Sequence, residues 1–302
     1  MTDVNVRENQ IRINDLDIHF KTFGKGDTPV VLLHGWGIDS EKYTETAENL
    51  ILQSKSLDLR IKVIIPDLPG FGKSGVPKEN WNLDNYVDFT DKFIETVTRG
   101  RGFEMIKNIL KNITLNNLGS GILSVNKEPD PPRKFILIGH SFGGRIAIKY
   151  AARYPEKVEK LILAGAAGIK HPLNPKQRMF FAMAKIGKAI FSLPVMNKLD
   201  RYAKIFLYKA AREKDYINST PKMKEIMKNV IDENLLPILD HVRVSTLLLW
   251  GRSDRSTPLA DGNSIHDKIK GSEMIIFDDA NHSLPYQKPD EFAKAIIMFI
   301  KK

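Results

Sequence analysis

Short runs of apolar residues, separated by turn residues, recur along this chain and restrict its fold more than any other feature of the sequence. The later runs are nearly continuous in Val, Ile and Leu, which is typical of strands that a parallel sheet buries on both faces. The first two alternate between apolar and polar residues, as antiparallel edge strands do. The predicted strands are Ile11–Asn14, Asp17–Phe23, Pro29–Leu33, Ile61–Ile65, Phe135–Ile138, Lys160–Ala164, Ser245–Trp250 and Glu273–Phe277.

Amphipathic segments of helical length lie between these runs. Leu83, Val87 and Ile94 return near helical spacing, and Pro289 stands at a first helical turn, where proline is tolerated. Alternating strands and helices predict an α/β fold: a mostly parallel, doubly wound sheet covered on both faces, with ligands at the carboxyl ends of its strands. The predicted helices are Glu41–Gln53, Leu83–Thr96, Phe142–Arg153, Leu259–Lys268 and Pro289–Ile300.

Two stretches interrupt the alternation. Residues 99–133 are long for a connection and carry turn signals, so we interpret them as a surface insertion of unknown role. Residues 169–240 show helical patterns broken by prolines and no clear strand. We therefore predict a helical cap at 169–240, inserted into a core made of residues 1–168 and 241–302.

Composition excludes several classes of site. The 302 residues include no cysteine, which excludes disulfides, thiolate nucleophiles and Cys-containing metal sites, and agrees with a reducing cytoplasm. The net charge of +10 would suit a nucleic-acid partner, but no nucleic-acid-binding motif accompanies it. Most of the excess positive charge lies between Gly168 and Asp240, where the sequence has 14 Lys or Arg but only 7 Asp or Glu. We interpret this excess as solvated helix faces.

The N-terminal sequence MTDVNVRENQ lacks the basic and apolar regions of a secretory signal. No run of about 18 apolar residues appears in the sequence. We expect a soluble, cytoplasmic protein without stable membrane insertion, although peripheral binding through the basic, apolar segment 179–196 stays open. The sequence does not indicate an oligomeric state.

The sharpest chemical signal is the sequence GHSFGG at residues 139–144, directly after a predicted strand and directly before a predicted helix. A G-x-S-x-G sequence in this context is typical of a nucleophile elbow, a sharp turn that exposes the hydroxyl of its serine. The alternative is a glycine-rich turn in which Ser141 only caps a helix.

A second glycine turn, HGWG at residues 34–37, follows another strand. Acyl transfer needs backbone N–H donors for a developing oxyanion, and the amides of Trp36 and Phe142 are the candidates.

An acid and a histidine follow the last two predicted strands. Asp254 comes just after Ser245–Trp250, and His282 comes shortly after Glu273–Phe277. The chain order Ser, Asp, His is the order that a catalytic triad takes on such a sheet. Asp254 would orient His282, which would take the proton of Ser141. As alternatives, Asp254 is a turn residue or helix cap ahead of Pro258, and His282 is a loop histidine.

With these motifs the sequence resembles the cap-bearing, small-molecule branch of the α/β-hydrolase family over nearly its whole length. The matching motifs are HGWG at 34–37, DLPGFGKS at 67–74, GHSFGG at 139–144, GRSD at 251–254 and NHSLPYQKPDEF at 281–292. The resemblance implies a triad of Ser141, Asp254 and His282, with oxyanion-hole amides at Trp36 and Phe142. Related dehalogenases and epoxide hydrolases carry aspartate in place of Ser141, which disfavours those activities. Carbon–carbon bond hydrolases of the family often carry asparagine where this chain has His140.

Two other motifs are weaker. Residues 70–75 spell G-x-G-x-x-G, but Val76 and Pro77 follow where a dinucleotide site needs a helix. The overlapping Gly72-Lys73-Ser74 would complete a phosphate-binding loop only if Asp67 were glycine. We expect no cofactor and no metal, because the remaining histidines lack paired metal-ligand spacing. We interpret His34 and His140 as residues that shape the turns, and His19, His171, His241 and His266 as edge-strand, loop or surface residues.

The predicted cap contains the segment 179–196, which is apolar around most of a helical circumference. Such a helix buries most of its surface against other helices or over a pocket. Because the cap lies between the strands that carry Ser141 and Asp254, we expect Phe180, Phe181 and Phe191 to line an acyl pocket. The sequence predicts a serine hydrolase that cleaves carboxylic esters with a small or medium apolar acyl group. Carbon–carbon bond or amide hydrolysis on the same triad and a noncatalytic ligand receptor are the alternatives.

Overall fold

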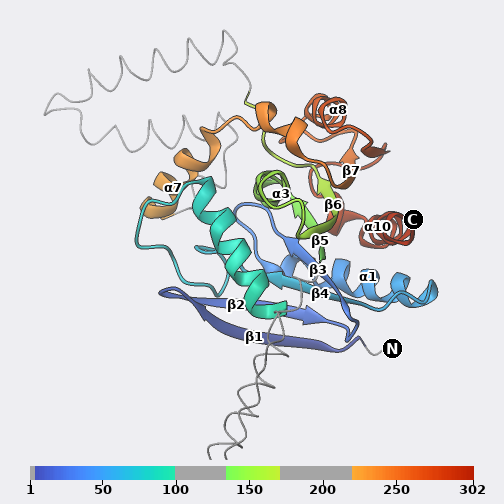
Figure 1. The fold of residues 1–302 in the computed structure, drawn as a ribbon, viewed down its shortest axis with the longest axis horizontal. Coiled ribbons are helices and arrows are strands. Elements are labelled where there is room, and N and C mark those ends of the chain that lie inside the picture. Colours follow the sequence, from blue (N-terminus) through green and yellow to red (C-terminus); the bar gives the residue numbers. More distant parts are fainter. Residues whose placement is uncertain (1–3, 99–133, 171–219) are drawn as a thin grey trace, which may run out of the picture.

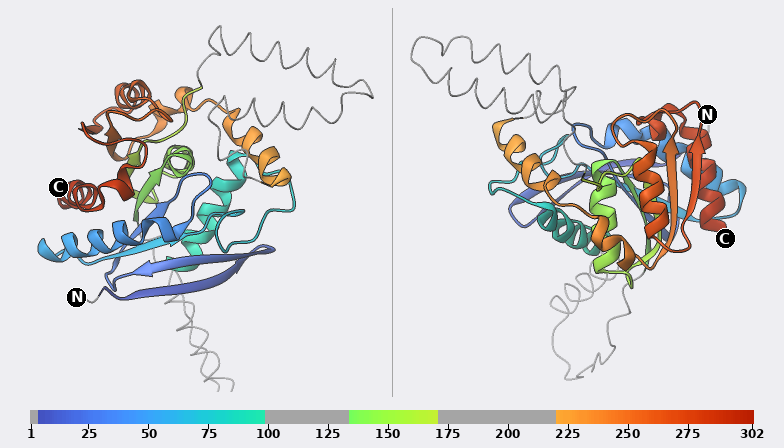
Figure 2. Two further views of the ribbon diagram at one scale, coloured as in Figure 1. Left: turned by 180° about the vertical axis from the view of Figure 1, so that it is seen from behind. Right: turned by 90° about the horizontal axis from the view of Figure 1, so that it is seen from above.

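The computed structural model describes residues 4–98, 134–170 and 220–302. Within these residues a single eight-stranded sheet runs through the molecule in the order β1-β2-β4-β3-β5-β6-β7-β8, with helices on both of its faces (Figures 1 and 2). The strands are β1 (Val6–Ile13), β2 (Leu16–Phe23), β3 (Thr28–Leu33), β4 (Ile61–Pro66), β5 (Phe135–His140), β6 (Val158–Ala164), β7 (Ser245–Gly251) and β8 (Glu273–Phe277).

Within the described sheet, the strands from β4 through β3 to β8 are parallel, whereas β1 pairs antiparallel with β2 and β2 pairs antiparallel with β4. The predicted α/β class and the eight predicted strands are thereby confirmed. The prediction that β1 begins at Ile11 is wrong, because the polar residues from Arg7 to Gln10 pair with residues 19–22 of β2 and extend the strand back to Val6. The interpretation of the second strand as an edge strand is also wrong, since β2 lies between β1 and β4 and is mostly buried.

Side chains of the central strands alternate between two apolar cores. Val30 and Leu32 of β3 pack with α1 and α10 on one face, and Val31 and Leu33 pack with α3 on the other. Figure 1 shows α1 and α10 together on one side of the sheet and α3 with α7 on the other. The described helices are η1 (Ser40–Tyr43), α1 (Thr44–Ser56), residues 83–98, α3 (Phe142–Arg153), α7 (Pro221–Ile231), η2 (Leu236–His241), α8 (Leu259–Lys268), α9 (Leu284–Gln287) and α10 (Pro289–Lys301).

The last strand departs from its prediction. The apolar run Glu273–Phe277 predicts a strand buried on both faces, but β8 is the outer strand of the sheet, and Ile275 and Ile276 keep 39% and 37% of their surface exposed. An apolar run is compatible with a buried strand and with an exposed edge, because sequence alone does not state which strand lies next to it.

Helix α7 is held on α3 by a buried arginine. Thr220 caps the start of α7 by accepting a hydrogen bond from the Met223 amide, and Pro221 occupies its first turn. At the other end, the Arg145 guanidinium donates hydrogen bonds to the carbonyl oxygens of Val230 and Glu233, at 3.0 and 2.6 Å. These bonds satisfy one carbonyl of the last turn of α7 and one of the loop that follows it, so α7 is anchored beside the strand–helix turn that follows β5.

Several predictions fall outside the described residues. They are the insertion at 99–133, most of the cap at 169–240, and the pocket residues Phe180, Phe181 and Phe191. In the part of the chain that the structure describes, no helix has the length and apolarity that crossing a bilayer requires.

Candidate active site

Ser141 occupies a strained turn between β5 and α3. Its backbone has φ 53° and ψ −113°, a left-handed conformation that residues other than glycine seldom adopt. Backbone hydrogen bonds hold the turn in place. The Ser141 amide donates to the Ala164 carbonyl, and the Ser141 carbonyl accepts from the backbone amides of Arg145 and Ala167. The turn therefore fixes the backbone from which the hydroxyl projects.

Glycines on both sides of Ser141 allow the chain to come this close to itself. A Cβ atom on Gly139 would lie 2.5 Å from the carbonyl oxygen of Gly143, and one on Gly143 would lie 2.1 Å from that of Leu33. The close approach brings the amide of Gly143 within 3.0 Å of the His34 carbonyl oxygen. The first turn of α3 is thus bonded directly to the HGWG turn.

The structure brings the three predicted triad side chains together. The Oγ atom of Ser141 lies 2.9 Å from Nε2 of His282, and Nδ1 of His282 lies 2.8 Å from Oδ2 of Asp254. Since a carboxylate only accepts, Nδ1 donates to Asp254 and Nε2 is left to accept from the serine hydroxyl. The Asp254 side chain is 1% exposed and the His282 side chain 23% exposed. This arrangement can transfer a proton from the serine to the imidazole.

Asp254 is held as an ionised carboxylate. Its Oδ1 accepts from the amides of Ser256 and Thr257, both at 2.9 Å, and its Oδ2 accepts from the Thr257 hydroxyl at 2.9 Å. Burial by itself raises the pKa of Asp254, but the bonds from His282 and Thr257 outweigh it, and the pKa lies below its ordinary value. The turn-residue interpretation is therefore compatible with the triad, since Asp254 organises its turn and contacts His282.

The two other acids near the end of the chain point elsewhere. Asp278 pairs with Arg252 at 2.5 Å and Asp279 pairs with Lys288 at 2.6 Å, and both carboxylates are more than 70% exposed. Among the described acids, Asp254 is the one in contact with His282.

The HGWG turn lies against the start of α3. The ring of Trp36 packs edge-on against Phe142 with ring centroids 5.0 Å apart. Phe142 is the first residue of α3, where a helix provides no acceptor for the backbone N–H. In the HGWG turn, Nδ1 of His34 donates to the Gly35 carbonyl at 2.7 Å, which fixes the peptide group whose N–H belongs to Trp36. The two predicted oxyanion-hole residues are thus neighbours beside Ser141.

Comparison with known proteins identifies the family. Residues 30–295 match the family described as the alpha/beta hydrolase family. This chain belongs to that family. In sequence it is 25% identical over 300 residues to a 2-hydroxy-6-oxononadienedioate/2-hydroxy-6-oxononatrienedioate hydrolase of Escherichia coli K12, covering 95% of this chain and 92% of the relative.

Solved structures of the same fold resemble this alpha/beta hydrolase over its whole length. A bromoperoxidase from Bacillus anthracis has a TM-score of 0.66 at 20% identity, covering 98% of this chain and 100% of its own. An esterase from Exiguobacterium antarcticum has a TM-score of 0.64 at 21% identity with the same coverage. At these identities the likeness establishes the fold, and the chemistry has to be argued from the site.

Sequence reasoning missed contacts that surround the candidate triad in this hydrolase. Thr257 donates to Asp254 and lies 3.2 Å from Nδ1 of His282, and its hydroxyl is also 3.0 Å from the Gly165 carbonyl oxygen. His140 and Tyr43 are joined by a hydrogen bond between residues 97 positions apart. The histidines of HGWG and GHSFGG were the available signal, and their interpretation as turn-shaping residues agrees with these bonds.

The glycine-rich loop at 70–75 belongs to an internal hydrogen-bond network. The Asp67 carboxylate accepts from the amides of Ser40 and Lys73, and lies 2.9 Å from Nδ1 of His19. A Cβ atom on Gly72, which has φ 53°, would lie 2.3 Å from the Asp67 carboxylate. The interpretation of His19 as an edge-strand residue is wrong, because it is 7% exposed in the interior strand β2.

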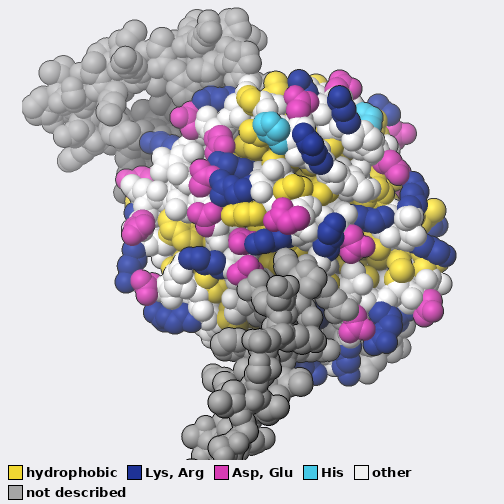
Figure 3. Space-filling view, in the orientation of Figure 1, with side chains coloured by type: hydrophobic (Ala, Val, Ile, Leu, Met, Phe, Trp, Pro, Cys, Tyr) yellow, Lys and Arg dark blue, Asp and Glu magenta, His cyan; other side chains and the backbone are white. Residues whose placement is uncertain are grey.

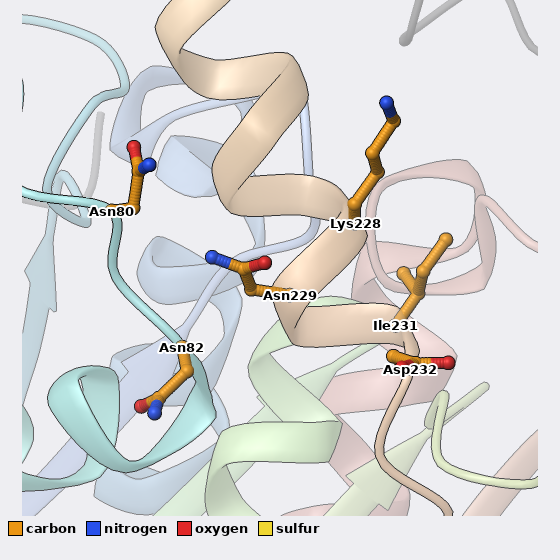
Figure 4. Close-up of a pocket in the computed structure, with 6 residues that line it drawn as sticks. All are labelled: Asn80, Asn82, Lys228, Asn229, Ile231 and Asp232. Atoms are coloured by element: carbon orange, nitrogen blue, oxygen red, sulfur yellow. The ribbon is translucent and has the colours of Figure 1, made fainter.

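A hollow of about 580 Å³ lies away from the triad, between α7 and the loop before residues 83–98 (Figure 4). Its lining is mostly polar and comes from Asn80, Asn82, Lys228, Asn229, Ile231 and Asp232. Within the described ranges, no three His, Cys, Asp or Glu side chains converge as metal ligands would. On the face in Figure 3, Lys and Arg are interspersed with Asp and Glu.

Proposed function

We propose that this alpha/beta hydrolase is a serine esterase that cleaves carboxylic esters through an acyl-enzyme on Ser141. The observation that carries the proposal is the chain of two hydrogen bonds, at 2.9 and 2.8 Å, from the Ser141 hydroxyl through His282 to Asp254. A serine hydroxyl is a weak nucleophile without a base, and a neutral imidazole held in this tautomer by a carboxylate supplies one.

In the proposed mechanism, Nε2 of His282 takes the proton of Ser141 while Oγ attacks the ester carbonyl. The carbonyl oxygen becomes negative and receives hydrogen bonds from the amides of Trp36 and Phe142. His282 then gives its proton to the oxygen of the departing alcohol, and the carbon–oxygen bond breaks. A water molecule repeats the sequence on the acyl-enzyme, with His282 as base, and releases the carboxylic acid.

The surroundings of the proposed oxyanion hole favour an apolar acyl group. Trp36 packs edge-on against Phe71, with centroids 4.8 Å apart, and Phe142 packs in the same way against Tyr86 at 5.0 Å. These rings form an aromatic cluster beside Ser141. We propose that Phe180, Phe181 and Phe191 of the cap complete an acyl pocket.

Carbon–carbon bond hydrolysis is the second candidate, and the Escherichia coli relative favours it. A compound named 2-hydroxy-6-oxononadienedioate carries a ketone and two carboxylates, and its hydrolysis at the ketone breaks a carbon–carbon bond. A cationic side chain is the usual partner of a bound carboxylate. Within the described residues, the hydrogen bonds of the Ser141, His282 and Asp254 side chains join them to one another, to Thr257 and to the Ser256 amide, and buried Arg145 donates to backbone carbonyls at and just after the end of α7.

The test compares the two substrate classes on one preparation. p-Nitrophenyl esters from acetate to palmitate are assayed beside a 2-hydroxy-6-oxo-dienoate, with Ser141→Ala as the blank for both. We expect ester kcat/KM to rise about threefold to fourfold per added methylene, up to a maximum at short or medium chain length, because each buried methylene contributes about 0.8 kcal/mol. A dienoate kcat/KM well above that of every ester would replace the esterase proposal with the second candidate. A maximum at palmitate with activation by detergent micelles would contradict a closed, small pocket.

A further inference from the structure

A line of hydrogen bonds crosses the site behind the triad, through two residues that take no part in the proposed mechanism. The Tyr43 hydroxyl at the end of η1 lies 3.3 Å from the amide nitrogen of Gly35 and 2.6 Å from Nδ1 of His140. On the other side of the same ring, Nε2 of His140 lies 2.8 Å from the carbonyl oxygen of His282. The line therefore connects the HGWG turn, the residue before Ser141 and the loop that carries His282.

Every proton on this line has only one consistent place. The His282 carbonyl can only accept, so Nε2 of His140 carries a hydrogen and donates it. In a neutral ring Nδ1 is then the acceptor, and the Tyr43 hydroxyl donates to it. The amide of Gly35 donates to the same hydroxyl oxygen. His140 is thus in the Nε2–H tautomer, whereas His34 and His282 both donate from Nδ1.

Burial keeps both residues neutral. His140 is 2% exposed, and burial together with nearby His282 lowers its pKa to about 3. Tyr43 is fully buried, and burial raises its pKa well above the ordinary value. Neither side chain gains or loses a proton over the pH range in which a histidine-based hydrolase works, so the directions of the bonds do not change.

We propose that Tyr43 and His140 are positioning residues that set the distance between the HGWG turn, Ser141 and His282. This inference rests on the esterase proposal and adds two residues to it. His140 is bonded covalently to Ser141 and by hydrogen bonds to the backbone of the base, while Tyr43 ties the HGWG turn to the same ring. Reaction rates depend steeply on such distances, and a displacement of about 1 Å can cost about 100-fold.

Imidazole NMR on the ¹⁵N-labelled, full-length enzyme tests the geometry without using activity. We expect His140 to carry its proton on Nε2 and not to titrate between pH 5 and 9. In Tyr43→Phe, the Nε2 proton of His140 should exchange faster with water, because its ring has lost a donor at Nδ1. A proton on Nδ1, or a His140 titration inside this range, would overturn the proposal.

Kinetics of four variants test the positioning role. Tyr43→Phe should lower kcat about tenfold and leave KM within about twofold, as expected for the loss of one or two buried hydrogen bonds. His140→Asn keeps an acceptor for Tyr43 but falls short of the His282 carbonyl, and we expect a loss of kcat of about 100-fold. His140→Gln restores a donor near the Nε2 position and should recover part of that loss. Tyr286→Phe is the matched control, because its ring packs against Tyr43 and His140 but its hydroxyl is not bonded to either.

A merely structural role would lower the melting temperatures of Tyr43→Phe and His140→Asn and leave kcat unchanged well below melting, which would contradict the proposal. Equal losses in His140→Gln and His140→Asn would contradict it as well. Failure of the esterase proposal is recognised separately: a wild-type enzyme whose Ser141 does not react with a fluorophosphonate would refute that function, whereas the tautomer of His140 is measured independently of it.

Discussion

Two buried aspartates in this molecule have nearly the same surroundings, yet we assign catalysis to only one of them. Asp254 after β7 and Asp67 after β4 each accept from two backbone amides, and each faces Nδ1 of a histidine, at 2.8 and 2.9 Å. Bonds to their oxygens lower the pKa of both carboxyls against the opposing effect of burial. Judged by the acid and the ring alone, the two pairs are equivalent.

The pairs differ at Nε2 of the histidine. At the Asp254 pair, Nε2 of His282 faces the Ser141 hydroxyl at 2.9 Å, whereas at the Asp67 pair, Nε2 of His19 faces the Glu8 carboxylate at 3.3 Å. A hydroxyl can give a proton to the ring and become a nucleophile, but an ionised carboxylate has none to give. A buried Asp–His pair by itself is therefore a structural contact. The Asp254 pair becomes a candidate active site because its histidine also faces Ser141, which is held on a strained backbone.

The largest difference between the pairs should appear when each acid is neutralised. Asp254→Asn should lower kcat about 10³-fold to 10⁴-fold, because an amide no longer selects the correct tautomer of His282. Asp67→Asn places an amide NH₂ against a backbone N–H, so it should lower the free energy of unfolding by about 1–3 kcal/mol and leave kcat within a few fold. Steady-state kinetics and urea unfolding of both variants make the comparison. If Asp278→Asn or Asp279→Asn removed activity instead, the acid would be misassigned.

Acid should destabilise the Ser141 side of the molecule through its buried histidines. The native pKa of His140 is lowered to about 3 by burial, so the unfolded chain, with a pKa near 6.5, takes up a proton that the native state refuses. The contribution of neutral His140 to the free energy of unfolding is complete above about pH 6.5 and is lost as the pH falls towards 3. Between pH 7 and 5, His140 should account for a loss of about 2 kcal/mol in the free energy of unfolding.

The measurement is urea unfolding at several pH values within that window, above the range in which Asp67 and Asp254 take up protons. His140→Asn should reduce the slope of stability against pH, and buried His34, whose pKa burial also lowers, should account for part of the remainder. Exposed His241 provides the control variant His241→Asn. An unchanged slope in His140→Asn would contradict the neutral, buried state of His140.

The smallest expected difference concerns one hydroxyl at each pair. Thr257→Val removes a donor to Asp254 and should lower kcat about threefold to tenfold, the range of one hydrogen bond. Ser74→Ala removes the hydroxyl that bonds the Asp67 carbonyl and the His19 amide, and should lower stability without changing kcat. A Thr257→Val enzyme with full kcat would show that the two amides of the turn suffice to hold Asp254.

The sheet and the candidate triad can be predicted from the sequence because both depend on patterns of residues that are close together along the chain. Strand β5, the GHSFGG turn and α3 follow each other without interruption, and the carboxyl ends of parallel strands meet at one edge, so Asp254 and His282 have to approach Ser141. The role of Asp254 could be chosen over that of Asp278 and Asp279 by its place after β7, and the ion pairs of the other two acids agree with that choice.

The rest depends on contacts between distant residues, which local patterns do not contain. The start of β1 is set by its pairing with β2, and the exposure of β8 by the lack of a strand beyond it in the described sheet. The bond from Tyr43 to His140 spans 97 residues, and no spacing rule predicts it. In the same way, nothing in the sequence near His19 shows that its ring lies between two carboxylates.

Covalent labelling with a fluorophosphonate, followed by mass mapping of the labelled peptide, tests whether Ser141 is the nucleophile. The reagent phosphonylates a serine only when a base activates its hydroxyl, so we expect one adduct per chain, on Ser141, formed within minutes at neutral pH. We expect no adduct in Ser141→Ala and strongly slowed labelling in Asp254→Asn. An adduct on another residue, labelling that persists in Ser141→Ala, or a folded wild-type enzyme that takes up no label would contradict the assignment of Ser141 as the nucleophile.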